Sequence, residues 1–441
     1  MSEQRVPTHQ PPSAPEPARG DHEGQTLNSF YGAFPYPWSP HQLTTLDDPA
    51  FYTRFLCQDV GDDTGGRVPV DADIWVAGCG TNQALITALR FPGARVLGTD
   101  ASENSLALCE ANARSLGVSN LTLRHEGLTK AAYREQFDYV LCTGVIHHNP
   151  DPSVCLRSLA AALRPDAVLE LMVYNTYHRQ EMIAFQKALT LIGIDQVGEL
   201  PERLALARGL GESVPADGLL GRKMEMFEYT DEAAWADSWM SPLEHSYSVE
   251  ELAAMADGCG LALETPTVNA FDQVSDSNQW DVPVPDGELR ARYDALPDPT
   301  RWQLVNLLLM DRSPMLWFYL GRAGRPRRTE AERDRAFLDT VHRHSAARQR
   351  RWTRQPDGGY QEAAATTAFP RPSRPPQSAP VRRRRRRAHD PAAARGPGCH
   401  PHPGRSAQRA AAIDEQSIPV PGRRPVTPGE ESRGTPTNSH R

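Results

Sequence analysis

The sequence lacks the cysteine pattern of a disulfide-stapled or zinc-binding protein. It contains seven cysteines, an odd number, and no two of them are spaced as Cys-x-x-Cys. A disulfide framework needs pairs, and a structural zinc site needs closely spaced thiolates, so we expect neither. We predict that most cysteines are reduced, partly buried and act as small apolar side chains, and that the chain holds no metal.

Long hydrophobic runs are also missing. No stretch approaches the roughly 20 consecutive apolar residues that a helix needs to cross a bilayer. Residues 1–25 are polar and rich in proline, without the apolar centre of a signal peptide. We therefore expect a disordered N-terminal arm, no membrane partner and a cytoplasmic protein.

The C-terminal region lacks large apolar side chains. Residues 371–441 contain no Leu, Met, Phe, Tyr or Trp, but 15 Arg and 13 of the chain's 39 prolines. Such a composition cannot bury a core, which predicts a disordered Arg/Pro-rich tail over residues 366–441. Two interpretations remain open. The tail is either a basic arm for an acidic partner or a segment without a selected function, because its bias resembles an out-of-frame reading of a GC-rich gene.

Charge is distributed unevenly along the chain. The whole sequence carries a formal net charge of −7, whereas residues 371–441 carry +10 and the remaining residues therefore −17. A catalytic domain that binds nucleic acid normally shows a basic face. The acidic body thus argues against nucleic acid as a partner.

Short apolar runs alternate with helical patterns between residues 73 and 173. Residues 73–77, 95–99, 121–123, 137–142 and 168–173 are predicted strands, and a helical pattern follows most of them. This alternation predicts an α/β fold, a Rossmann-like, doubly wound and mostly parallel sheet. The complete predicted division is a disordered arm (1–25), an aromatic cap or lid (26–70), a ligand-binding core (71–175), a substrate-cap and sheet-completing region (176–330), a helical extension (331–365) and the disordered tail (366–441).

A Gly-x-Gly turn follows the first predicted strand of this core. Gly78 and Gly80 allow a ligand to approach the backbone and the start of the next helix. Asp100 ends the second strand, 22 residues after Gly78, where a carboxylate can accept hydrogen bonds from both hydroxyls of a ribose. Together these residues predict an adenosine-containing ligand. The alternative is that Asp100 serves only the start of the following helix.

Four segments in this order resemble the motifs of class I S-adenosylmethionine (SAM)-dependent methyltransferases of the small-molecule type. They are VAGCGTNQ at 76–83, GTD at 98–100, FDYVLCTGVIHH at 137–148 and LRP at 163–165. A looser similarity continues through SYSVEEL at 246–252 and GCGL at 258–261. The resemblance implies SAM as the cofactor and methyl transfer to an O, N or C atom as the reaction, with a small secondary metabolite as one type of acceptor.

The resemblance also implies roles for individual residues. Ala77, Gly78 and Gly80 would line the methionine and ribose side of SAM, and Asp100 would bind the ribose hydroxyls. The other implied cofactor contacts are Ala101 and Glu126 near the adenine, and Thr143 and Gly144 near the sulfonium. The family's usual third glycine is replaced by Asn82, which constrains the loop after Gly80.

Besides a nucleic-acid methyltransferase tethered by the Arg-rich tail, against which the acidic body weighs, two other functions remain open at this stage. A nicotinamide dehydrogenase would share the Gly-x-Gly turn and the ribose acid, but residue 83 is Gln where its third glycine would stand, and no Tyr-x-x-x-Lys pair follows the fourth strand. A SAM-binding protein without turnover would act as an interaction module, with the Arg-rich tail as its contact surface.

The acceptor side is predicted from polar and aromatic residues near the carboxyl ends of the strands. His147 and His148 follow the fourth strand, where either could act as a general base or simply pack the loop. The residues predicted to line the acceptor pocket or a lid are Tyr36, Trp38, Tyr174, Asn175, Tyr177 and His245. An aromatic ring near the sulfonium would favour its positive charge, although the aromatic block at 30–38 is equally well explained as an anchor.

Overall fold

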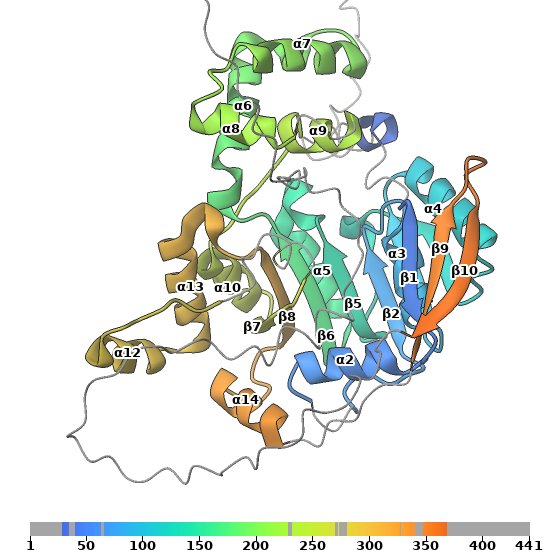
Figure 1. Ribbon diagram of the computed structural model, residues 1–441, viewed down its shortest axis with the longest axis vertical. Helices are drawn as coiled ribbons and strands as arrows, with labels where there is room; N and C mark the ends of the chain where they lie inside the picture. The colour runs from blue at the N-terminus through green and yellow to red at the C-terminus, as the bar shows by residue number, and fades with distance from the viewer. Residues whose placement is uncertain are drawn as a thin grey trace, which may run out of the picture.

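The fold is described from a computed structural model of the 441-residue chain (Figure 1). The structure describes residues 29–34, 40–62, 66–227, 232–269, 272, 280–326, 328–339 and 347–367. Its strands are β1 (Gln42–Leu46), β2 (Asp73–Ala77), β3 (Arg95–Asp100), β4 (Leu121–His125), β5 (Phe137–Thr143), β6 (Leu163–Val173), β7 (Leu261–Pro266), β8 (Leu316–Arg322), β9 (Arg348–Arg354) and β10 (Tyr360–Thr367).

Seven of these strands form one twisted sheet in the order β4-β3-β2-β5-β6-β8-β7. The pairs from β4 to β6 are all parallel, and β8 runs antiparallel to both β6 and β7. The chain proceeds outward on one side of β2 and then returns to its other side with β5. At such a reversal, doubly wound folds bind ligands in a crevice at the carboxyl ends of the strands, and we refer to this edge as the crevice. The predicted fold class is confirmed.

Helices cover both faces of the sheet (Figure 1). One core joins the sheet to α5, α10 and α13, and a second core joins its other face to α2, α3 and α4. The helices are α2 (Phe51–Asp59), α3 (Gln83–Arg90), α4 (Glu103–Ser115), α5 (Pro152–Ala162), α6 (Thr176–Ile192), α7 (Leu200–Glu212), α8 (Leu219–Glu225), α9 (Glu232–Trp239), α10 (Val249–Asp257), α12 (Gly287–Asp294), α13 (Asp298–Leu309) and α14 (Glu330–Asp339).

Local sequence fixes where several helices begin. Ser102 precedes α4 and its hydroxyl accepts a hydrogen bond from the Ser105 amide at 3.2 Å, as its position predicts. Ser248 precedes α10 and forms a reciprocal capping box with Glu251. The central strands need no such signal, because β2 is a continuous apolar run buried on both faces of the sheet.

A helical cap stands beyond the carboxyl ends of the strands (Figure 1). Helices α6 to α9 and residues 29–34 share a separate apolar core. Phe30 and Phe34 are buried in that core, and the rings of Phe185 and Trp239 pack edge to face within it at 5.6 Å. Over the residues described, the aromatic N-terminal segment therefore packs into the core of the cap. Tyr36 and Trp38 lie outside the described residues.

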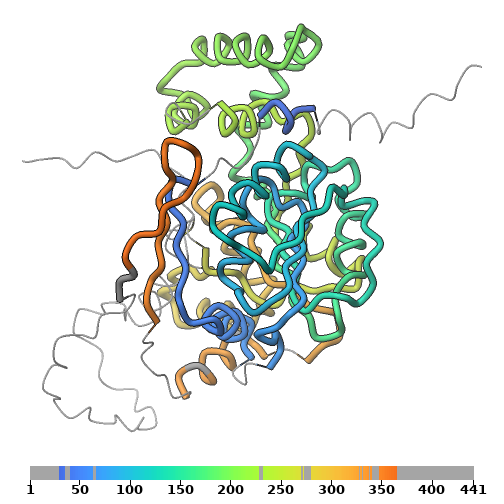
Figure 2. Tube along the Cα trace, turned by 90° about the vertical axis from the view of Figure 1, so that its right-hand side faces the viewer, coloured from blue at the N-terminus to red at the C-terminus, as the bar shows by residue number. Residues whose placement is uncertain are grey.

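The predicted helical extension at 331–365 is wrong for most of its length. Among the described residues of this range, only those of α14 are helical, whereas β9 pairs with both β1 and β10 in a separate antiparallel sheet. Figure 2 shows blue β1 beside the orange β9 and β10. β9 lies in the middle of this sheet and buries Trp352 against the α3 side of the core. Its partner in β1 lies about 300 residues away in sequence, so no local pattern indicates the pairing.

Candidate functional site

The loop after β2 exposes backbone because two of its glycines have a left-handed conformation. Gly78 has φ +68° and Gly80 has φ +53°. A Cβ atom on Gly78 would lie 2.5 Å from the Val145 side chain, which leaves no room for alanine. The Gly78 and Cys79 amides donate to the Thr99 carbonyl at 2.8 and 2.9 Å. The turn is therefore held against the end of β3 while the start of α3 faces the crevice.

Asp100 joins two loops at the carboxyl end of β3. Its Oδ2 accepts a hydrogen bond from the Gly80 amide at 2.8 Å, and its Oδ1 accepts one from the Ser102 amide at 2.8 Å. Burial raises the pKa of Asp100, and these amides oppose that shift because they favour the carboxylate. Each carboxylate oxygen keeps a further lone pair for hydroxyl donors from the crevice.

The residues after β3 and β4 continue this edge. The Ala101 carbonyl contacts His125 Nε2 at 2.9 Å, and the Glu126 amide donates to the Asp100 carbonyl at 2.9 Å. The Glu126 carboxylate accepts a hydrogen bond from the Tyr133 hydroxyl. Burial and this carboxylate raise the pKa of Tyr133 to about 12. Glu126 thus lies one residue beyond the strand that pairs with Asp100, with one of its oxygens already engaged.

The end of β5 forms the other wall of the crevice. The Gln83 side-chain amide donates to the Thr143 hydroxyl, which ties the start of α3 to β5. Gly144 follows with φ +77°, and a Cβ atom there would meet no atom within 4 Å. Bare backbone at Gly78, Gly80 and Gly144 together with the Asp100 carboxylate fits a ribose-containing ligand with a bulky group beside β5.

His147 is buried completely and forms no hydrogen bond through either ring nitrogen among the described residues. Its ring lies against Tyr174 with centroids 3.9 Å apart and against His148 at 4.4 Å. Burial, together with the positive charges of His148, Arg179 and His245, places the pKa of His147 well below its ordinary value. The imidazole is neutral near pH 7, so one nitrogen can accept and the other can donate.

His148 differs from its neighbour because it is anchored. Its Nδ1 contacts the Leu243 carbonyl at 3.0 Å and the Ser241 hydroxyl at 3.1 Å. The Tyr31 ring meets the His148 ring edge to face at 6.1 Å. These contacts connect the cap to the loop after β5.

The remaining predicted acceptor residues considered next are Asn175, Tyr177 and His245. Asn175 is buried and caps α6, because its Oδ1 accepts a hydrogen bond from the Tyr177 amide at 3.1 Å. Its Nδ2 donates to the Ser313 hydroxyl at 3.0 Å. Both ends of the Asn175 side chain are therefore hydrogen-bonded within the fold. Tyr177 is half-buried in the first turn of the same helix. His245 donates its main-chain amide to the His147 carbonyl at 2.8 Å, and its Nε2 is buried without a partner among the described residues.

Several residues at this site were not singled out from the sequence. The Arg179 guanidinium lies 4.1 Å from the Tyr174 ring centroid and forms a buried ion pair with Glu244 at 2.5 Å. Asp237 accepts hydrogen bonds from the Tyr31 hydroxyl at 3.0 Å and from the Tyr174 hydroxyl at 3.3 Å. These residues are separated by up to 213 positions and form no local motif, so only the tertiary structure brings them together.

No group of three or more His, Cys, Asp or Glu side chains in the described ranges is arranged to hold a metal ion. Within the same ranges, no helix combines the length and apolar character that a membrane span requires.

Comparison with known proteins identifies residues 75–169 as a match to a family model described as a methyltransferase domain. An uncharacterised protein of a Synechococcus strain is 27% identical over 72% of this chain and 76% of its own length. A ubiquinone biosynthesis O-methyltransferase of Haemophilus ducreyi is 34% identical over 22% of this chain and 43% of its own length. The similarity to that enzyme thus covers less than half of it.

A similar architecture occurs in the solved structure of PKMT2 from Rickettsia typhi in complex with AdoHcy. It aligns with a TM-score of 0.51 at 13% sequence identity, covering 74% of this chain and 65% of that chain. At this identity the similarity concerns the fold alone.

Proposed function

We propose that the chain transfers a methyl group from SAM to an O, N or C atom of a small-molecule acceptor, through the class I SAM-dependent methyltransferase domain at residues 75–169. The observation that carries the proposal is the pair of hydrogen bonds from the Gly80 and Ser102 amides to Asp100. They place a carboxylate between two loops at the crevice of the sheet. That is the position from which an acid binds ribose hydroxyls.

In this proposal the two sides of the crevice bind different parts of SAM. Gly78, Gly80 and Ala77 hold the methionine and ribose side of SAM, Asp100 accepts from the ribose hydroxyls, and Ala101 and Glu126 border the adenine. Thr143 and Gly144 border the sulfonium end. SAM supplies an activated methyl group on a positively charged sulfur, so the protein must mainly orient the acceptor in line and exclude water.

We place the acceptor beside His147. A buried neutral imidazole with two nitrogens unpartnered among the described residues has lost its hydration without a replacement, and an acceptor hydroxyl or amine would restore a hydrogen bond. The His147 ring packs against Tyr174. Tyr174 is itself held by the Arg179 guanidinium over its ring and by the hydrogen bond from its hydroxyl to Asp237. His147 therefore accepts the hydrogen bond that orients the nucleophile and takes its proton where one must leave. His148 positions this loop.

The decisive experiment is isothermal titration of SAM and of NADH into the full chain and into two variants. We expect micromolar binding of SAM, no binding of NADH, and loss of SAM binding in Asp100→Ala. The control is Asp71→Ala, which removes an exposed carboxylate just before β2 and should bind SAM like the parent. Binding of NADH in place of SAM would refute the methyltransferase proposal. SAM binding without methyl transfer to any acceptor in a screen would support a non-catalytic binding module instead.

A further inference from the structure

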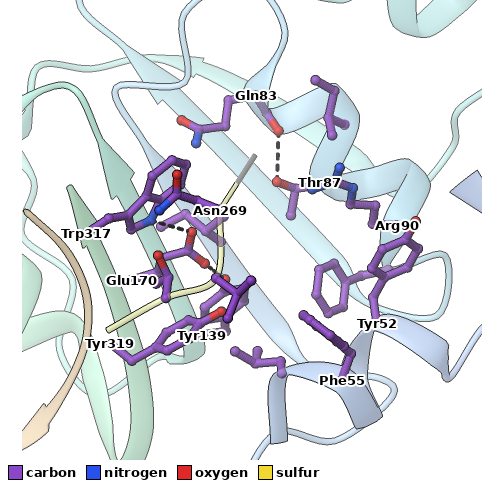
Figure 3. A pocket seen from close by; sticks show the side chains of 16 residues that line it. Tyr52, Phe55, Gln83, Thr87, Arg90, Tyr139, Glu170, Asn269, Trp317 and Tyr319 are labelled. Atoms are coloured by element: carbon purple, nitrogen blue, oxygen red, sulfur yellow. Dashed lines mark hydrogen bonds between the residues drawn. The ribbon is translucent and has the colours of Figure 1, made fainter. Parts of the chain in front are cut away.

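A second cavity lies on the flank of the sheet, below the cofactor crevice. It has a volume of about 110 Å³ and is partly enclosed between the sheet and helices α2 and α3 (Figure 3). Strands β5, β6 and β8 form its floor, and residues 267–269 after β7 form one edge. None of the residues proposed above to contact SAM lines this cavity.

Six of the sixteen residues that line this cavity are aromatic. The aromatic lining residues are Tyr52, Phe55, Phe91, Tyr139, Trp317 and Tyr319. Ring faces attract cations, most strongly where water is excluded. The cavity is thus suited to a ligand that combines apolar surface with a positive charge.

A carboxylate lies in the floor of the cavity. Glu170 comes from the middle of β6, and its two oxygens accept hydrogen bonds from different donors, the Tyr139 hydroxyl and the Trp317 indole N–H at 2.8 Å. Both groups donate to the carboxylate oxygens, which is the arrangement that favours the ionised form. Figure 3 shows Glu170 between Trp317 and Tyr139, facing the open centre of the cavity.

Glu170 has no cation within ion-pair distance in the part of the chain that the structure describes. Burial raises the pKa of Glu170, while its two hydrogen bonds and the positive charge of Arg90 oppose that shift. Arg90 also lines the cavity, but its guanidinium lies over the Tyr52 ring at 5.4 Å instead of pairing with Glu170. A half-buried carboxylate without an ion-pair partner costs free energy, part of which an entering cation would recover.

Two further acidic residues, Asp59 and Asp272, lie near the cavity. The Tyr319 hydroxyl donates to Asp59 at 3.5 Å, and Asn269 on the cavity edge donates to Asp272 at 2.6 Å. Both donors, Tyr319 and Asn269, line the cavity, so each of these acids lies one hydrogen bond behind its wall.

We propose that this cavity is a binding site for a small organic ammonium ion, with Glu170 as its counter-charge and the aromatic side chains as its walls. The cavity adjoins the cofactor crevice through Gln83, which lines the cavity and also donates to Thr143. Glu170 pairs with Leu141, two residues before Thr143 along β5. An ammonium ligand therefore binds on the α3 face, about 7 Å along the strands from the end of β5.

The test compares three probes of one shape and different charge. Benzylammonium, benzyl alcohol and benzoate are titrated calorimetrically into the full chain at pH 7. We expect benzylammonium to bind more tightly than the other two. Benzoate binding best would overturn the proposal, because Arg90 and not Glu170 would then select the ligand. Absence of benzylammonium binding at roughly 10 mM, where even a Kd of about 1 mM would be evident, would overturn it as well.

Two variants locate the binding. Glu170→Gln keeps the shape of the side chain and should weaken benzylammonium at least about tenfold while leaving benzyl alcohol unchanged. Its retained binding of benzyl alcohol also reports that the cavity still folds. Phe55→Leu removes one aromatic wall from a half-buried position on α2 and should weaken both probes. The matched control is Glu110→Gln, an exposed acid on α4, with no expected effect. Unchanged benzylammonium affinity in Glu170→Gln would refute the assignment.

The same measurements do not depend on methyl transfer. Asp100→Ala should bind benzylammonium like the parent chain even though it is expected to lose SAM. Failure of the proposed function therefore appears as lost or absent SAM binding, whereas failure of the ammonium site appears only in the probe titrations.

Discussion

His147 and Tyr174 lie face against face at the carboxyl end of the sheet, with ring centroids 3.9 Å apart and planes inclined by 35°. The two residues follow β5 and β6, which are adjacent parallel strands. The stack therefore depends on the pairing of these strands. It fixes a buried imidazole beside the predicted methyl-transfer site, with neither nitrogen used within the described residues.

Replacement of His147 by phenylalanine separates chemistry from stability. In His147→Phe the new ring would keep the aromatic contact with Tyr174, and two unpartnered polar atoms would be removed, so we expect the free energy of unfolding to stay equal or to rise. Methyl transfer should fall at least about tenfold, in keeping with the usual contribution of a general base or orienting group. Urea denaturation and a turnover assay check both parts. Unchanged turnover would remove His147 from the proposed acceptor site.

The same substitution should change how stability depends on pH. The pKa of His147 is lowered on folding, so the unfolded chain binds the extra proton at acidic pH. The neutral folded form is favoured above the ordinary histidine pKa near 6.5, and this contribution is lost as pH falls below it. We expect the parent chain to lose more stability than His147→Phe between about pH 7.5 and 5, measured by denaturation at each pH. Parallel curves would contradict the buried neutral state.

Two glycines of the cofactor crevice should respond differently to alanine. Both have positive φ, which costs a non-glycine residue about 1–2 kcal/mol. Gly144→Ala meets open space, so we expect only that cost and a loss of SAM affinity. Gly78→Ala would also place a Cβ atom 2.5 Å from Val145, so it should destabilise the chain more. Equal denaturation midpoints for the two variants would show that the loop around Gly78 shifts to accommodate the added methyl group.

The aromatic N-terminal segment offers a test of anchor against lid. Phe30 is buried in the core of the cap, so Phe30→Ala should destabilise the fold by about 3–5 kcal/mol. Tyr31→Phe removes only the hydroxyl that donates to Asp237 and serves as the milder control. Thermal denaturation and SAM titration distinguish the two roles. A large loss of SAM affinity in Phe30→Ala with an unchanged Tm would favour a lid.

Two truncations test the division at the C-terminus. Removal of residues 368–441 leaves β10 intact and takes away a segment with few large apolar side chains, so Tm and SAM affinity should hardly change. Removal from residue 348 onward deletes β9 and β10, takes Trp352 out of the core and leaves Leu43 of β1 without its cover. That shorter chain should be clearly less stable. Equal stability of the two would mean that the small sheet contributes nothing to the core.

The sequence by itself indicated the resemblance to a methyltransferase domain and predicted the principal sheet. Continuous apolar runs predicted the buried strands at 73–77 and 137–142, because strands covered on both faces need no polar alternation. Gly78 and Asp100 directly follow or end such strands in the chain, so their place at the crevice followed from the same local pattern. Residues 75–169 match a methyltransferase domain, in agreement with the resemblance found in the sequence.

Only the tertiary structure decided what depends on residues distant in sequence. The pairing of β1 with β9 replaced an expected helix by a sheet, since arginine-rich strand β9 acquires its partner about 300 residues away. The burial of His147 and the anchoring of His148 required the cap to fold over the loop after β5. The cavity around Glu170 combines several separate segments of the chain. Such contacts arise from packing between segments distant in sequence, so local periodicity does not predict them.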